Sequence, residues 1–364
     1  MSRKLLPLSA TAALMGGTAA ADVPSVAVDI APVHSLVARV MEGVGAPKLI
    51  VPPGASPHEY SLRPSGAAAL QDADLVFWVG EDLAPWMADA VKNLAVNATV
   101  TALLEADGTI LLDFREGALF EAHAHEDEDH EEHADEKGHD HDHDEHAHDD
   151  EDGHEHEEHA HDDEDEHESE EHAHDDEDEH ESEEHAHDDH GHAHGDHDPH
   201  AWLLPANAST WLNLFAAQLS AADPDNASDY FANAAAGRAE IEALSAEVSE
   251  ILDAVRGGKF IVFHDAYQYF ETAFDFPASG AISLGDASDP SPARIAEIQA
   301  RVREEGIGCV LAEPQFNPGL VATVLDGTDA STGVIDPLGA DLEPGPALYP
   351  QLIRNMAATL AGCL

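Results

Sequence analysis

Hydrophobic positions along the 364-residue chain follow strand and helix patterns in turn. In the first part, short apolar runs typical of buried strands are separated by segments with apolar residues at helical spacing. The predicted strands are Ser25–Ile30, Lys48–Val51 and Asp74–Val79, and the predicted helices are Val33–Met41 and Ser65–Gln71. This order favours a parallel sheet flanked by helices.

A long helix opens the second part. From Asp225 to Val255, apolar residues recur at steps of three, four and seven, and Gly257 and Gly258 then end the helix. The later predicted strands are Lys259–Phe263, Gly308–Ala312 and Gly333–Ile335, and the later helices are Pro292–Glu305, Pro318–Leu325 and Pro350–Ala361. The pattern predicts an α/β fold of two lobes, each with a mostly parallel sheet flanked by helices, joined by one long helix.

Residues 122–198 follow neither pattern. They hold 23 of the 27 histidines, 39 acidic residues and one lysine, and the sequence HAHDDEDEHESEE occurs in tandem from His159 and from His172. Because no residue there is more apolar than alanine, the segment cannot build a core, and we expect a disordered insertion. The expected organisation is a signal peptide (1–21), an N-terminal lobe (22–121 and 199–224), the insertion (122–198), a linker helix (225–256) and a C-terminal lobe (257–364).

The net charge of −60 limits the classes of partner. The insertion carries −38 of this charge and the rest of the chain −22. Such a field repels nucleic acid and anionic membrane surfaces, so neither is expected as a partner, whereas cationic ligands remain.

The first 21 residues have the pattern of a secretory signal peptide. Arg3 and Lys4 precede a largely apolar run from Leu5 to Gly17, and Ala19–Ala21 fits the small-residue cleavage pattern. A retained membrane anchor is the alternative, but the run is shorter than the ~20 apolar residues that span a bilayer. We therefore expect export from the cytoplasm without stable membrane insertion; the resemblance described below implies the periplasm.

Two cysteines fit an oxidising compartment, where an even number favours pairing. We expect a disulfide between Cys309 and Cys363 that ties the C-terminal tail to a core strand. Two separate buried thiols are the alternative. The spacing is not that of a Cys-x-x-Cys metal site.

Three histidines outside the insertion lie just after a strand or at a turn. His58, His200 and His264 are each close to proline or glycine or follow a strand, and ligands of open α/β sheets gather at the carboxyl ends of strands. Asp336 follows another short apolar run, and three imidazoles with one carboxylate form a common tetrahedral zinc set. Taken singly, each histidine could be a core or capping residue, and Asp336 could form an Asx turn before Pro337.

These residues stand in motifs that resemble a known family. The chain is similar, through nearly the whole mature sequence, to the zinc-specific periplasmic substrate-binding proteins of ABC importers, the cluster A-I metal-binding group. The motifs are GASPHEYSLRPS, ADLVFWVG, HAWL after an acidic histidine-rich insertion, FHDAYQYF, AEPQF, and IDPLG with a terminal cysteine.

The resemblance implies a C-shaped pair of α/β lobes bridged by a rigid helix, with zinc in the cleft between them. By motif, His58 and His200 from the first lobe and His264 from the second are the ligands. Asp336 matches a carboxylate that binds metal in many relatives, although in some members a water or a different carboxylate takes that place. Certain relatives have glutamate directly before the first histidine, whereas this chain has Pro57, which favours Asp336 or water.

Four neighbouring residues receive lesser roles. We expect Glu59 to hydrogen-bond a ligand rather than to bind the metal, and Asp265 and Tyr267 to orient or pack beside His264. His34 has no counterpart among the family's ligands, and a place facing the cleft is the less favoured interpretation.

The insertion resembles the charged histidine-rich loop of zinc-specific family members. Because its imidazoles are not preorganised, its sites should be weak, and we expect an accessory collector or sensor of zinc. A solvated spacer is the alternative.

The sequence thus predicts a binding protein, not an enzyme, that captures Zn²⁺ as a transported ligand and delivers it to a cognate ABC permease in the inner membrane. A monomer is expected. Manganese or iron capture is disfavoured by three histidines in place of two histidines with two carboxylates. A secreted zinc hydrolase is disfavoured because no His-Glu-x-x-His motif occurs, and a pure metal buffer would leave the two-lobed body unexplained.

Overall fold

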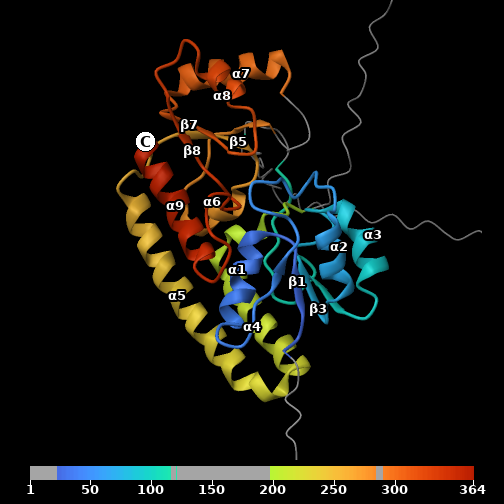
Figure 1. The fold of residues 1–364 in the computed structure, drawn as a ribbon. Coiled ribbons are helices and arrows are strands. Elements are labelled where there is room, and N and C mark those ends of the chain that lie inside the picture. The colour runs from blue at the N-terminus through green and yellow to red at the C-terminus, as the bar shows by residue number, and fades with distance from the viewer. Residues whose placement is uncertain (1–22, 116–119, 121–196, 284–289) are drawn as a thin grey trace, which may run out of the picture. The chain divides into compact units, whose positions relative to one another are not determined.

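The computed structural model describes residues 23–115, 120, 197–283 and 290–364. The expected signal peptide and almost all of the histidine-rich insertion lie outside the described residues. Within them the chain forms two parallel four-stranded sheets flanked by helices, which confirms the predicted two-lobed α/β fold (Figure 1).

The N-terminal sheet has the strand order β2-β1-β3-β4. Alternate residues of its strands enter different cores, as the two-residue period of a strand requires. In β3, Leu75 and Phe77 face the large central core, whereas Val76 and Trp78 face a smaller core beneath α2 and α3. The elements are β1 (Val26–Val28), α1 (Ala31–Val40), β2 (Lys48–Leu49), α2 (Pro64–Gln71), β3 (Leu75–Trp78), α3 (Pro85–Leu94) and β4 (Thr99–Ala102).

The C-terminal sheet repeats this topology in the order β6-β5-β7-β8. Along β5, Phe260 and Val262 enter the central core, and Ile261 and Phe263 enter a separate core with α7 and α8. The elements are β5 (Phe260–His264), α6 (Gln268–Phe274), β6 (Ala281–Ser283), α7 (Pro292–Glu305), β7 (Cys309–Ala312), α8 (Pro318–Leu325) and β8 (Ser331–Val334).

A long helix, α5 (Ala227–Asp253), connects the two halves and packs against α4 (Pro205–Ala222) and α9 (Leu348–Cys363) (Figure 1). One face of α5 is buried at helical spacing through Tyr230, Ala234, Gly237, Ile241, Leu244, Val248 and Leu252. The central core runs without interruption from the first sheet through these helices to the second. The two lobes are therefore joined by packed apolar side chains as well as by the chain itself.

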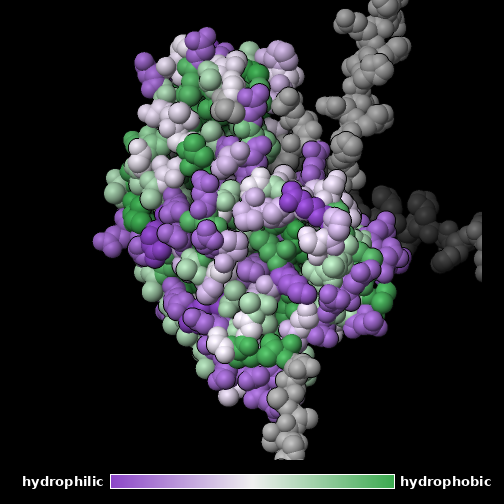
Figure 2. Space-filling model, in the orientation of Figure 1, coloured by the Kyte–Doolittle hydropathy of each residue, from purple (hydrophilic) through white to green (hydrophobic). Residues whose placement is uncertain are grey.

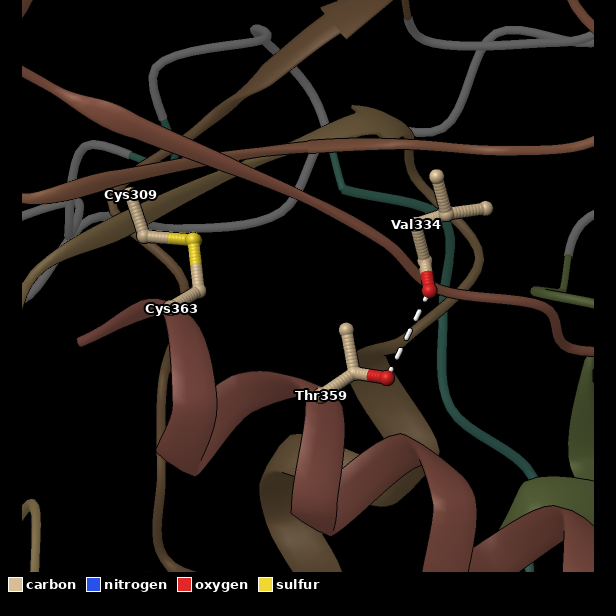
Figure 3. The surroundings of a disulfide bond; sticks show 4 residues. All are labelled: Cys309, Val334, Thr359 and Cys363. Atoms are coloured by element: carbon tan, nitrogen blue, oxygen red, sulfur yellow. Dashed lines mark hydrogen bonds between the residues drawn. A yellow bond between two sulfur atoms is a disulfide. The ribbon is translucent and has the colours of Figure 1, made fainter.

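Cys309 and Cys363 form the expected disulfide, with their Cα atoms 5.6 Å apart (Figure 3). The bond ties the end of α9 to the start of β7. One turn earlier in α9, the Thr359 hydroxyl donates to the carbonyl of Val334 in β8 at 3.4 Å. The C-terminal helix is thus fixed to two neighbouring strands.

Each predicted strand and helix has a counterpart whose bounds differ by at most two residues. The sequence interpretation missed β4, β6, α3, α4 and α6.

Polar and apolar residues intermix on the face of the molecule in Figure 2. None of the helices in the described ranges has the length and apolar character needed to span a bilayer.

Candidate metal centre

His264 is the last residue of β5, at the edge where parallel strands of the C-terminal sheet end. Strand β5 pairs with β6 on one side and with β7 on the other, so the order in which strands are added to the sheet reverses at β5. Crevices form at such positions. Glu313 directly follows β7, and its Oε1 lies 2.6 Å from Nδ1 of His264.

His200 begins the short helical turn Ala201–Leu203 and is held by a carboxylate of its own. The Oδ1 atom of Asp198 accepts from the His200 backbone N–H at 2.9 Å and lies 2.7 Å from the imidazole Nδ1. Both residues are buried. Asp198 falls in the range assigned to the disordered insertion, yet its backbone N–H donates to the Leu112 carbonyl. Asp198 is therefore part of the folded N-terminal lobe.

His58 lies in the loop between β2 and α2 and is half-buried. Trp86, in the first turn of α3, donates its indole N–H to the carbonyl of Pro57 at 2.7 Å. The backbone N–H of His58 donates to the Ser56 hydroxyl at 3.2 Å. The loop is thus anchored on the residue that precedes the histidine.

The three histidines converge although they are far apart in the sequence. One ring nitrogen from each lies within 4.8 Å of those of the other two, and no other such group of metal-ligand residues occurs in the described part of the chain. The ring centroids are 5.3 Å apart for His200 and His264, 5.4 Å for His58 and His200, and 6.3 Å for His58 and His264.

The space between them is a cavity of about 10 Å³ that Trp202, Gln315 and Phe316 help to line. That volume is about the room of one water molecule, so the site suits a single ion and excludes an organic ligand. With a carboxylate at Nδ1 of His200 and of His264, the proton resides on Nδ1, and Nε2 is the nitrogen that a metal would take. The donor set is rich in nitrogen, which is typical of zinc.

Asp336 is not part of this group. Its Oδ1 accepts from the backbone N–H of Leu338 at 2.9 Å and its Oδ2 from that of Ala340. The Gln315 amide also lies 3.4 Å from Oδ1. In the described arrangement Asp336 closes the turn after β8, and its role as a fourth ligand stays a prediction.

The other candidates lie around the group rather than in it. His34 is buried in α1 with its Nε2 3.1 Å from the Pro47 carbonyl, and desolvation lowers its pKa. Glu59 is exposed. Tyr267 is buried with its ring centroid 6.2 Å from that of His264.

Asp265 is buried next to His264 and pairs with Arg115, which also pairs with Glu271. Burial raises the pKa of both carboxyls, and the Arg115 guanidinium opposes this rise. The sequence interpretation expected an orienting role for Asp265 but did not identify Arg115 or Glu271.

Asp198 and Glu313 were also missed as partners of the histidines. Glu313 stands in the family-like motif AEPQF, which was a usable signal. Asp198 is the last of the 39 acidic residues of the insertion, and no local pattern separates it from the others.

Comparisons with known proteins identify a family and several relatives. The family model for ZnuA, described as the periplasmic component A of the zinc-uptake complex, matches residues 26–363. The chain is 43% identical over 353 residues to the high-affinity zinc uptake system protein ZnuA of Brucella abortus, covering 97% of this chain and 95% of the relative. It is 42% identical to the protein of that name from Paracoccus denitrificans, covering 98% of each.

A crystal structure of ZnuA superimposes with a TM-score of 0.64 at 20% identity, covering 94% of this chain and 99% of the other. At this level of identity the likeness concerns the fold alone.

Proposed function

Because the chain belongs to the ZnuA family of periplasmic zinc-uptake components, we propose that His58, His200 and His264 capture one Zn²⁺ ion for delivery to the permease of an ABC importer. The observation that carries this proposal is the convergence of the three imidazoles within 4.8 Å. Family membership makes the chain a substrate-binding protein for transport rather than an enzyme. Zinc is therefore its cargo.

Two carboxylates support the proposal electrostatically. A carboxylate on Nδ1 fixes the orientation of an imidazole and raises its basicity toward a dication on Nε2. Asp198 does this for His200 and Glu313 for His264. The fourth coordination position falls to water or to Asp336.

Zinc is favoured over manganese by this set. Mn²⁺ prefers more oxygen ligands and six-coordination, whereas Zn²⁺ accepts a nitrogen-rich tetrahedral set. The cavity of about 10 Å³ has room for one ion, not for an ion with several bound waters, and this favours the smaller coordination number of Zn²⁺.

We further propose that the histidine-rich insertion is an accessory collector or sensor of zinc. Its 23 histidines support this role, because many weak sites raise the local concentration of metal. An isolated peptide of residues 122–198 should chelate several equivalents of Zn²⁺ at pH 7. Since imidazole must be neutral to bind metal, the capacity should fall below about pH 6. No chelation at pH 7, or undiminished chelation at pH 5, would rule out imidazole collection.

The capture site is tested by zinc stoichiometry under competition with a strong chelator, which strips weakly held metal. We expect one tight equivalent in the full chain, its loss in His264→Ala, and its retention in His197→Ala. His197 is a matched control because it is a partly exposed histidine outside the group. A tight equivalent that survives His264→Ala, or its absence from the unsubstituted protein, would refute the proposal.

A further inference from the structure

Arg115 forms a buried ion-pair cluster with two acidic residues of the C-terminal lobe. Its Nε lies 3.0 Å from both carboxylate oxygens of Asp265, and its Nη2 also donates to that carboxylate. Its Nη1 and Nη2 donate to the two oxygens of Glu271 at 2.7 and 3.0 Å. The Asp265 and Glu271 side chains are 2% and 5% exposed, and among the described residues both form their ion pair with Arg115.

The guanidinium is also fixed on its face. Its central carbon lies 3.5 Å above the centroid of the Phe120 ring. A planar fork that serves two carboxylates and stacks on an aromatic ring uses properties that arginine has and lysine lacks.

Arg115 joins the segments that carry two of the proposed zinc ligands. On one side, Asp265 directly follows His264 at the end of β5. On the other side, Asp113, two residues before Arg115, forms a backbone bridge with His197. The Asp198 N–H donates to the Leu112 carbonyl, and Asp198 holds His200.

Hydrogen bonds of Tyr269 connect the same segments a second time. The Tyr269 hydroxyl donates to the Asp198 carbonyl at 3.0 Å and accepts from the Leu112 backbone N–H at 3.0 Å. Tyr269 belongs to α6, as does Glu271. The start of the C-terminal lobe is thus fastened to the His200 segment by one ion-pair cluster and one hydroxyl.

We propose that Arg115 is a positioning residue for zinc retention, which holds the His264 segment against the His200 segment so that their imidazoles are already gathered when the ion arrives. The proposal rests on the zinc site proposed above. A preorganised site binds more tightly because the ion does not have to assemble its ligands, and ligand-supporting groups act in this way without contacting the metal. Loss of the cluster should therefore act mainly on the rate of zinc dissociation.

The experiment compares Arg115→Met and Arg115→Lys in the full-length mature protein. Zinc dissociation is followed by stopped-flow transfer to a chelator, and the thermal midpoint is recorded without metal. We expect dissociation about tenfold faster in Arg115→Met, at the lower end of the effect of groups that support metal ligands. Arg115→Lys should restore part of this loss, because an ammonium serves as a point charge but not as a fork.

Arg354→Met is the matched control. Arg354 pairs with both oxygens of Glu247 at 2.7 and 2.8 Å and connects α9 to α5, and neither of these two residues adjoins a proposed zinc ligand in the sequence. The rate of zinc dissociation from Arg354→Met should stay within twofold of that from the unsubstituted protein. The visible spectrum of bound Co²⁺ should change in Arg115→Met and not in Arg354→Met, because only the former disturbs the coordination geometry.

Removing Arg115 alone leaves two buried carboxylates without a charge partner, which can prevent folding. The variant that combines Arg115→Met, Asp265→Asn and Glu271→Gln removes all three charges. Its side-chain carbonyl at position 271 can still accept from the Ala278 N–H, as the carboxylate of Glu271 does at 3.0 Å. This neutral triple variant should also release zinc about tenfold faster.

The outcomes separate this inference from the proposed function. If the unsubstituted protein binds one tight equivalent that His264→Ala loses, and the neutral triple variant releases zinc within twofold of the unsubstituted rate, the positioning role of Arg115 is wrong and the zinc site stands. If no tight equivalent exists in the unsubstituted protein, the zinc site itself is wrong.

Discussion

Replacing Glu313 with glutamine should weaken zinc binding although Glu313 does not belong to the group of ligands. Its Oε1 lies 2.6 Å from Nδ1 of His264, and its side chain is 1% exposed. Glutamine has nearly the same shape, and its carbonyl oxygen can still accept from Nδ1–H. The substitution therefore removes the charge and keeps the hydrogen bond.

The magnitude follows from the two kinds of hydrogen bond. A bond to a charged acceptor contributes about 1.5–3 kcal/mol, whereas a neutral one contributes about 0.5–1.5 kcal/mol. The two ranges differ by about 1 kcal/mol at their lower ends and about 1.5 kcal/mol at their upper ends, which corresponds to a rise in the Kd for zinc on the order of tenfold. Asp198→Asn should act equally through His200, and the double variant should lose about a hundredfold if the two effects add.

The assay is competition between the protein and a chelator at pH 7.4. Trp202 lines the cavity with its ring centroid 5.2 Å from that of His200, so its fluorescence should report occupancy. Glu247→Gln is the control, because it removes a carboxylate from an ion pair with Arg354, and neither residue lines the cavity. If both Glu313→Gln and Asp198→Asn bind zinc within twofold of the unsubstituted protein, the carboxylates do not tune the ligands and the reasoning fails.

Three further predictions concern other parts of the molecule. Replacing both Cys309 and Cys363 with alanine should lower the free energy of unfolding by about 4 kcal/mol. This is the chain-entropy value for a disulfide across a separation of 54 residues. If the guanidinium chloride midpoint of this variant equals that of the oxidised protein, the prediction is wrong. Burial raises the pKa of Asp29 to about 7. The folded state therefore holds the proton of the Asp29 carboxyl more tightly than the unfolded state does. Because of this difference, the free energy of unfolding falls as the pH rises from about 4 to about 7. Between pH 5 and pH 8, the stability of the unsubstituted protein should fall relative to Asp29→Asn by on the order of 2 kcal/mol, whereas parallel pH profiles of the two would refute this assignment. Backbone N–H groups already donate to both oxygens of Asp336. Asp336→Ala should therefore lower the free energy of unfolding by about 1 kcal/mol and change the Kd for zinc less than threefold. A larger rise in the Kd would mean that this carboxylate binds the ion.

The sequence by itself determined the elements whose signals are local. The predicted bounds of α7 and α8 match those of the structure, because each helix starts with proline after a capping residue. Ser291 caps the first and Asn317 the second. The disulfide was also predicted correctly, and the three histidines that the structure brings together were selected from their motifs in the linear chain, whereas their role as zinc ligands stays a prediction.

Elements with weak local signals were missed. Strand β4 lies at the edge of its sheet and is half-exposed, and β6 has only three residues, so neither shows a clear alternation. Their pairing with β3 and β5 defines them. Helix α4 did carry a readable signal, because Ala208, Trp211, Phe215 and Leu219 recur at steps of three and four.

Only the tertiary structure decided which acidic residue serves which histidine. Glu313 meets His264 across 49 residues because β7 runs parallel to and beside β5, so that their carboxyl ends meet at one edge. Arg115 meets Asp265 across 150 residues. The role of Asp198 comes from its contacts, because its carbonyl accepts from the Tyr269 hydroxyl and its carboxylate meets the His200 imidazole. Charge, hydrogen bonding and burial at such a site arise from segments that packing brings together, and a linear pattern of residues does not contain those distances.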